Sequence, residues 1–228
     1  MTGEPTPPNL ECVVVEPTTA HTGTVIWLHG LGASGHDFED MPPLLCLDHI
    51  RYVFPHAPTM QVTINYGTRM PAWYDIVDLD WNNEEREDEA SIRSSAELVV
   101  RLLEDEHARG IAYERMVLAG FSQGGALALH VGTRFPEALA GIMALSAYQL
   151  LPDAHAAEAD PGNATTPMLF CHGRLDPMVP IDQGRSAHEA MAEAGHPTEW
   201  AEYMMEHQVI MPQVERIGTW LASRLPGE

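Results

Sequence analysis

Short runs of apolar residues alternate with amphipathic stretches along almost the whole chain. The apolar runs are rich in Val, Ile, Leu and Met, and each has the length of a β-strand. We expect strands at 11–16, 24–29, 51–55, 115–121, 140–145, 167–172 and 199–205. Several of these runs are continuous rather than alternating, which is typical of strands that are covered on both faces.

Between these runs, apolar residues recur at helical spacing. The clearest stripe consists of Ile92, Ala96, Val99 and Leu103. We expect Asn82 and Glu85 to form the capping box of this helix. Residues 126–135, 187–194 and 214–221 show further helical patterns.

The alternation of strands and helices predicts one α/β domain over residues 1–228, and this length is ample for a buried core. We expect a single domain with a mostly parallel central sheet and helices on both faces. Segments 57–81 and 151–166 interrupt this alternation of strands and helices. Insertions at the carboxyl ends of strands commonly shape ligand sites, so we place both beside the functional site.

Charge and composition narrow the classes of function. The chain carries 33 acidic and 12 basic residues, a formal net charge of −21, and every basic residue is arginine. Such a surface repels phosphate backbones and anionic headgroups, which argues against nucleic-acid partners and membrane surfaces. We see no secretory signal and no membrane-spanning run, and therefore expect a cytoplasmic protein. We expect Cys12, Cys46 and Cys171 to be reduced, buried thiols.

The strongest chemical signal is Gly120-Phe121-Ser122-Gln123-Gly124, which fits the pattern G-x-S-x-G. A predicted strand precedes it and a predicted helix follows it. A serine on such a sharp turn projects its hydroxyl above the sheet, and small neighbours make the strained backbone tolerable. We interpret Ser122 as a nucleophile; the alternative is a glycine-rich turn that contains an incidental serine.

A serine nucleophile needs a histidine base and an orienting carboxylate, which follow it in the order acid, histidine in this fold. Asp176 lies just beyond a predicted strand, whereas its nearest rival, Asp182, is expected to cap the next helix. His207 follows the last strand. Of its competitors, His188 lies within a helical pattern and His196 at a helix stop, so we favour Asp176 and His207.

An oxyanion hole requires two backbone N–H groups. We expect one from Gln123, the residue after the nucleophile, and one from the loop that follows the strand at 24–28. That loop reads His29-Gly30-Leu31-Gly32, and Leu31 is the natural donor. Taken alone, this segment could equally be an ordinary glycine turn.

Six blocks of the sequence, in order, resemble the phospholipase/carboxylesterase family of α/β-hydrolases. They are HGLGASGHDF, FPHAPTMQVTINYG, MPAWYDI, LAGFSQGGALAL, CHGRLDPMVP and YMMEHQV. The resemblance implies that Ser122, Asp176 and His207 form the catalytic triad and that Leu31 and Gln123 supply the oxyanion hole. It also implies that the region containing Trp73 borders the acyl pocket, and the MPAWYDI block is more similar to the bacterial carboxylesterases than to the eukaryotic acyl-protein thioesterases.

Three further apolar residues near the predicted site, Met70, Met178 and Val179, are candidates for the pocket wall; core packing is the equal alternative for the methionines. One position departs from the family pattern. Glu206 precedes His207 where the family usually has glycine, and a positive φ there would strain a glutamate.

The sequence therefore predicts a serine carboxylesterase that acts on small-molecule esters of short to medium acyl chain. The rivals are a thioesterase acting on acylated proteins or acyl-coenzyme A, a lysophospholipase, and a non-catalytic binding module with the same fold. The mechanism needs no metal and no organic cofactor. The resemblance is also compatible with a homodimer.

Overall fold

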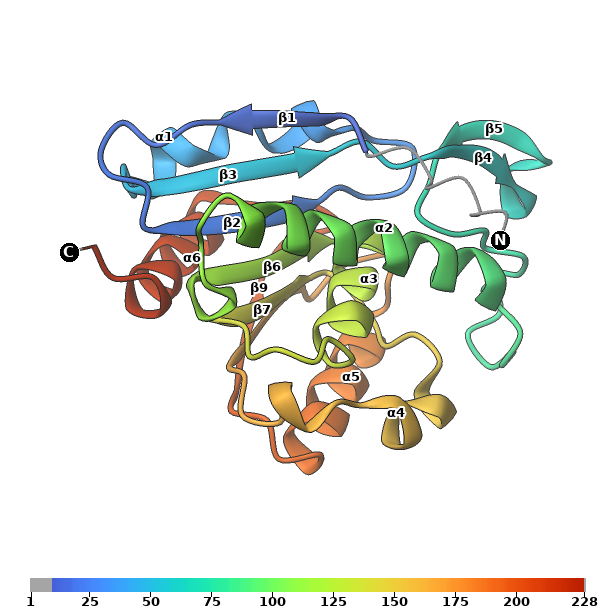
Figure 1. Cartoon of the computed structure of the whole chain (residues 1–228). Helices are drawn as coiled ribbons and strands as arrows, with labels where there is room; N and C mark the ends of the chain where they lie inside the picture. Colours follow the sequence, from blue (N-terminus) through green and yellow to red (C-terminus); the bar gives the residue numbers. More distant parts are fainter. Residues whose placement is uncertain (1–9, 228) are drawn as a thin grey trace, which may run out of the picture.

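The computed structural model describes residues 10–227 and contains a seven-stranded sheet (Figure 1). In spatial order, the strands are β1 (Cys12–Val15), β3 (Ile50–Pro55), β2 (Gly23–Leu28), β6 (Met116–Phe121), β7 (Gly141–Leu145), β8 (Met168–Gly173) and β9 (Thr198–Tyr203). The first strand pairs antiparallel with β3, and the other pairs are parallel. The predicted α/β class, the mostly parallel sheet and all seven expected strands are confirmed.

Helices cover both faces of this sheet. They are α1 (Met41–Leu45), α2 (Glu89–Ala108), α3 (Gln123–Gly132), α4 (Pro152–Glu158), α5 (Ile181–Glu193) and α6 (Met211–Arg224). The side chains of β2 alternate between the two faces: Ile26 and Leu28 belong to the apolar cluster that includes residues of α2, α3 and α5, whereas Val25 and Trp27 belong to the one that includes residues of α1 and α6. A strand buried on both faces has no solvent-facing positions, which explains the continuous apolar run Val25–Leu28.

The two segments that interrupt the pattern contain regular structure of their own. Segment 57–81 includes a hairpin of β4 (Thr59–Val62) and β5 (Thr68–Pro71), at the upper right of Figure 1. Segment 151–166 contains α4. Neither was expected, because four-residue strands and a helix of seven residues are too short to show a clear hydrophobic period.

Three local expectations were wrong. Helix α2 begins later than the capping box we expected: Asp88 is its N-cap and accepts the Ser91 N–H at 2.8 Å, while Asn82 instead binds Asp80 in a turn. Pro180, not Asp182, precedes the first residue of α5. All three cysteines are free, but Cys46 is exposed rather than buried, and Cys12 is only partly buried.

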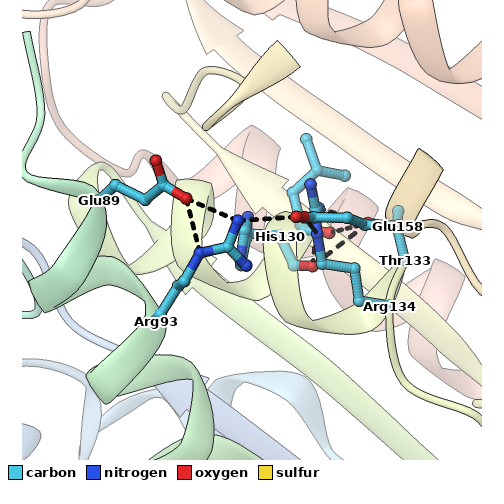
Figure 2. Close-up of polar contacts among 7 residues, drawn as sticks. Glu89, Arg93, His130, Thr133, Arg134 and Glu158 are labelled. Atoms are coloured by element: carbon cyan, nitrogen blue, oxygen red, sulfur yellow. Dashed lines mark hydrogen bonds and ion pairs between the residues drawn. The ribbon is translucent and has the colours of Figure 1, made fainter. Parts of the chain in front are cut away.

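A polar cluster joins α2, α3 and α4 on one side of the molecule (Figure 2). Glu158 lies between two guanidinium groups, with Arg93 and Arg134 each donating to it at 2.7 Å. Arg134 also donates to the backbone carbonyl of His130, whose ring is buried. Hydrogen bonds from the two arginines lower the pKa of Glu158 to about 2. The cluster thereby fixes α4 against the helices that support the nucleophile turn.

Candidate active site

The turn that carries Ser122 has the strained geometry expected of a nucleophile. Ser122 has φ 54° and ψ −122°, between the end of β6 and the first residue of α3. Chain packing leaves no room for a Cβ two residues before or two residues after Ser122. A Cβ at Gly120 would lie 2.2 Å from the Gly124 carbonyl oxygen, and one at Gly124 would lie 2.4 Å from the carbonyl oxygens of Leu28 and His29. Glycine is therefore required at both positions, and the serine is held above the sheet.

Asp176 and His207 come together from two adjacent strand ends. Asp176 follows β8 and His207 follows β9, and His207 Nδ1 donates to Asp176 Oδ2 at 2.7 Å. The other carboxylate oxygen accepts the N–H groups of Met178 and Val179, both at 2.9 Å. Burial alone would raise the pKa of Asp176, but the hydrogen bonds from His207 and Val179 outweigh it and hold that pKa below its usual value. The carboxylate is thus ionised and fixes the tautomer of the imidazole.

Ser122 and His207 line the same cavity, and the ring of Phe121 lies 4.7 Å from the ring of His207. Ser122 is the N-cap residue of α3, but its side chain makes no capping hydrogen bond to the described residues of that helix. The structure therefore brings together the three residues that the sequence suggested for nucleophile, base and acid.

Two backbone N–H groups lie beside Ser122 and have no acceptor in the part of the chain that the structure describes. Within residues 10–227, neither the N–H of Leu31 nor that of Gln123 donates to a carbonyl or a side chain. The first residues of a helix have no intrahelical acceptor, which explains Gln123. The loop of Leu31 lies against the nucleophile, because a Cβ at Gly30 would be 3.4 Å from the Cβ of Ser122. Both donors are available for an oxyanion.

A buried hydrogen-bond network that the sequence did not reveal supports this pair of donors. The Gln123 side chain accepts the Trp73 N–H at 2.8 Å and donates to the Tyr74 carbonyl at 2.7 Å. His29 donates from Nδ1 to the Gly30 carbonyl at 2.7 Å and accepts the Ala57 N–H at Nε2. Burial lowers the pKa of His29, which favours the neutral ring that this pattern requires.

The cavity above Ser122 has a volume of about 450 Å³. Its lining comprises Gly30, Leu31, Ala33, Asp37, Phe38, Ile64, Ile76, Leu79, Arg86, Phe121, Ser122, Gln123, Tyr148, Met178, Val179, His207, Gln208 and Val209. Of the residues proposed from sequence for the pocket wall, Met178 and Val179 line the cavity.

The other two proposed wall residues, Trp73 and Met70, lie outside this lining. Trp73 has no exposed surface, and its indole N–H donates to the His29 carbonyl at 2.8 Å, so it packs beneath the oxyanion loop. Met70 lies on β5, where its sulfur accepts from the amide of Asn65 at 3.2 Å. Conversely, Arg86 and Tyr148 line the cavity and were missed. Arg86 is the only basic residue between residues 78 and 89, and a single arginine in an acidic segment is the sequence signal that could have drawn attention to it.

Glu206, the residue that departs from the family pattern, is exposed and does not have positive φ. The backbone here therefore imposes no strain on a side chain, and glutamate fits without cost from its conformation.

Within residues 10–227, no cluster of three or more His, Cys, Asp or Glu side chains is arranged to hold a metal ion. No helix among the same residues has the length and apolar composition needed to cross a bilayer.

A strained serine at a strand-to-helix turn, with an acid and a histidine at later strand ends, defines the class of α/β-hydrolases. The family model described as Phospholipase/Carboxylesterase matches residues 9–225. The chain therefore belongs to the phospholipase/carboxylesterase family, as its motifs indicated.

Named relatives and solved structures agree with this membership. The chain is 37% identical to acyl-protein thioesterase 1 of Neurospora crassa, covering 94% of this chain and 91% of that protein. It is 34% identical to acyl-protein thioesterase 1 of Gibberella zeae, covering 94% and 95%. Among solved structures, Arabidopsis thaliana SOBER1 matches with a TM-score of 0.85 at 30% identity, covering 90% of this chain and 99% of that one. Acyl-protein thioesterase 2 of Zea mays matches with 0.84 at 28%, covering 94% and 99%.

Proposed function

We propose that this hydrolase cleaves carboxylic esters of short to medium acyl chain through an acyl-enzyme on Ser122. The observation that carries the proposal is the 2.7 Å hydrogen bond between His207 and Asp176 at the cavity that Ser122 also lines. A histidine that is oriented by an ionised carboxylate can accept the proton of a serine hydroxyl.

Acylation begins when Ser122 Oγ attacks the acyl carbon and His207 Nε2 takes the hydroxyl proton. Asp176 holds the Nδ1–H tautomer and stabilises the imidazolium that forms. Because the carboxylate also accepts two backbone N–H groups, its own position does not depend on the histidine. The base is therefore oriented before the substrate arrives.

The tetrahedral intermediate carries its negative charge on the former carbonyl oxygen. The N–H groups of Leu31 and Gln123 donate to this oxygen and stabilise the charge more in the transition state than in the ground state. His207 then protonates the leaving oxygen. Water attacks the acyl-enzyme by the same sequence of proton transfers and releases the acid.

A second candidate is thioester hydrolysis, which the named relatives favour. Two relatives that cover more than 90% of this chain are called acyl-protein thioesterases. A thiolate leaves more readily than an alkoxide, so the same residues can cleave both bonds, and the preference is set by how the cavity binds the two sides of the substrate.

Initial rates on 4-nitrophenyl esters from acetate to palmitate, together with one acyl thioester, test the proposal. We expect a maximum at short to medium chains and loss of the activity in Ser122→Ala. A preference for the thioester would replace the main proposal by the second candidate. Equal rates in wild type and Ser122→Ala on every substrate would overturn both, provided that circular dichroism shows the variant to be folded.

A further inference from the structure

A second histidine lies beside the carboxylate that orients His207. His172, on β8, is buried with only 1% of its surface exposed. Its Nε2 lies 3.7 Å from Oδ2 of Asp176, the oxygen that also accepts from His207. This distance is too long for a hydrogen bond. His172 is not among the residues that line the cavity above Ser122, so its place next to Asp176 requires an explanation other than contact with a substrate.

The hydrogen bond of His172 is made to the turn that holds Asp176. Its Nε2 donates to the Val179 carbonyl at 2.9 Å. Oδ1 of Asp176 in turn accepts the N–H groups of Met178 and Val179, both at 2.9 Å. Val179 is therefore bound on its N–H side by the carboxylate and on its carbonyl side by the histidine. Because β8 is hydrogen-bonded to a strand on each side, His172 anchors this turn to a rigid part of the sheet.

Two contacts fix the ring of His172. It stacks on Trp200 of β9, with ring centroids 6.1 Å apart and an angle of 22° between the planes. It also packs against α5 at Gly184, where a Cβ would lie 2.2 Å from Nδ1 of the histidine. Any side chain at position 184 would displace the ring, so glycine is required there, although it costs about 1 kcal/mol within a helix.

The ring is neutral at neutral pH. Burial lowers the pKa of His172; among the charged groups around the ring, Asp176 favours its protonation, whereas His207 and Arg185 oppose it. A neutral ring that donates from Nε2 has no proton on Nδ1, so it places no positive charge beside Asp176. The charge of the carboxylate is thus left to stabilise the imidazolium that forms on His207.

We infer that His172 is a positioning residue for the hydrolysis at Ser122: through Val179, it holds the carboxylate of Asp176 where that carboxylate orients His207. This inference rests on the proposed function and deepens it, because it adds a residue outside the cavity on which the reaction depends.

Two substitutions of His172 separate its hydrogen bond from its packing. His172→Gln keeps an N–H donor for the Val179 carbonyl, whereas His172→Leu leaves that carbonyl unpaired. For a short-chain 4-nitrophenyl ester, we expect His172→Leu to lower kcat by about 10- to 100-fold with KM near wild type, because the substrate binds as before but the base is misplaced. His172→Gln should recover most of this loss.

Gly184→Ala tests the same contact from α5 without changing His172. The new methyl group displaces the ring, so kcat should fall in the same direction as in His172→Leu, again with KM near wild type. Ser186→Ala is the matched control, since it is an exposed position of the same helix where alanine also favours helix formation. It should keep the wild-type kcat.

A double-mutant cycle shows whether His172 acts through Asp176. In Asp176→Asn the orienting charge is already lost, so adding His172→Leu should lower kcat further by less than about twofold. An equal loss in the presence and absence of the Asp176 carboxylate would refute action through this residue.

A purely structural role predicts a different result. His172→Leu would then unfold at a lower urea concentration, but the folded enzyme, verified by circular dichroism, would keep the wild-type kcat. That outcome overturns the inference, as does a His172→Gln enzyme that is as impaired as His172→Leu.

Nuclear magnetic resonance of isotope-labelled histidine rings tests the wild-type enzyme without any variant. We expect the proton of His172 on Nε2 at neutral pH, since only this tautomer donates to Val179. A proton on Nδ1 alone would overturn the inference. Absence of Ser122-dependent hydrolysis on every ester in the wild-type enzyme would instead refute the proposed function, and the inference with it.

Discussion

The side-chain carbonyl oxygen of Gln123 accepts the backbone N–H of Trp73 at 2.8 Å, and both residues are buried. Through this contact, the first residue of α3 is joined to the chain that leaves the β4–β5 hairpin. The backbone N–H of Gln123 is the proposed oxyanion donor, so its side chain and its main chain serve different parts of one site. The hydrogen bond couples the shape of the inserted segment to the position of the donor.

Replacing this side chain tests the coupling. Gln123→Met keeps the backbone N–H but leaves the Trp73 N–H and the Tyr74 carbonyl without their partner. We expect the free energy of unfolding, measured in urea, to fall by about 1–3 kcal/mol for each unsatisfied group. We also expect kcat/KM for a short ester to decrease. Gln61→Met, at an exposed position of the hairpin, should leave both quantities near wild type; a stable, fully active Gln123→Met protein would refute the coupling.

Neutralising the proposed acid separates orientation from folding. In Asp176→Asn, the amide oxygen can still accept the Met178 and Val179 N–H groups, so the loop should keep its conformation. The amide cannot stabilise the imidazolium, and we expect kcat to fall by about 10³–10⁴-fold. Asp182→Asn is the matched control because that carboxyl is exposed on α5. Comparable losses in the two variants would show that Asp176 is not the orienting acid.

The space around two glycines, one in the nucleophile turn and one in α6, predicts opposite effects of alanine substitution on stability. A Cβ at Gly124 would lie 2.4 Å from two carbonyl oxygens, whereas one at Gly218 in α6 would lie 3.6 Å from its nearest neighbour. We expect Gly124→Ala to lower the free energy of unfolding by about 3 kcal/mol or to prevent folding. Gly218→Ala should be neutral or raise it by about 0.5–1 kcal/mol, because alanine favours the helix. Thermal and urea unfolding of the two variants measure the contrast.

Burial of His130 predicts how stability depends on pH. Desolvation, assisted by the charge of Arg134, lowers the pKa of His130 to about 3 in the folded protein. The unfolded chain binds this proton below about pH 6.5, and the folded protein does not. Stability from this group is therefore complete above pH 6.5 and decreases as the pH falls from 6.5 toward 3.

His130→Leu removes this titration. Between pH 6 and 4, the slope of unfolding free energy against pH should decrease by about 1.4 kcal/mol per pH unit, as measured by urea unfolding at several pH values. Leu129→Val, a buried substitution without a titrating group on the same helix, should lower stability but keep the slope. An unchanged slope in His130→Leu would mean that the folded protein binds this proton as readily as the unfolded chain.

Sequence reasoning located the strands and the catalytic candidates because both depend on short-range information. Continuous apolar runs identify buried strands, and the pattern around Ser122 reflects a turn whose geometry forbids side chains at Gly120 and Gly124. The order of Asp176 and His207 after it, each beyond a strand, was enough to select them from several aspartates and histidines.

Of the four wall residues proposed from sequence, only Met178 and Val179 line the cavity, so tertiary structure decided the rest of its wall. Trp73 was proposed as a pocket residue, yet it is buried beneath the oxyanion loop, while Arg86 from an acidic loop lines the cavity. Local sequence does not indicate which face of an irregular segment turns inward, because such segments have no hydrophobic period. That orientation is set by contacts distant in sequence, such as Gln123 with Trp73 and Arg86 with Tyr148. Backbone pattern and motif order thus determined the fold and the candidates for the reacting groups, and long-range packing decided what surrounds them.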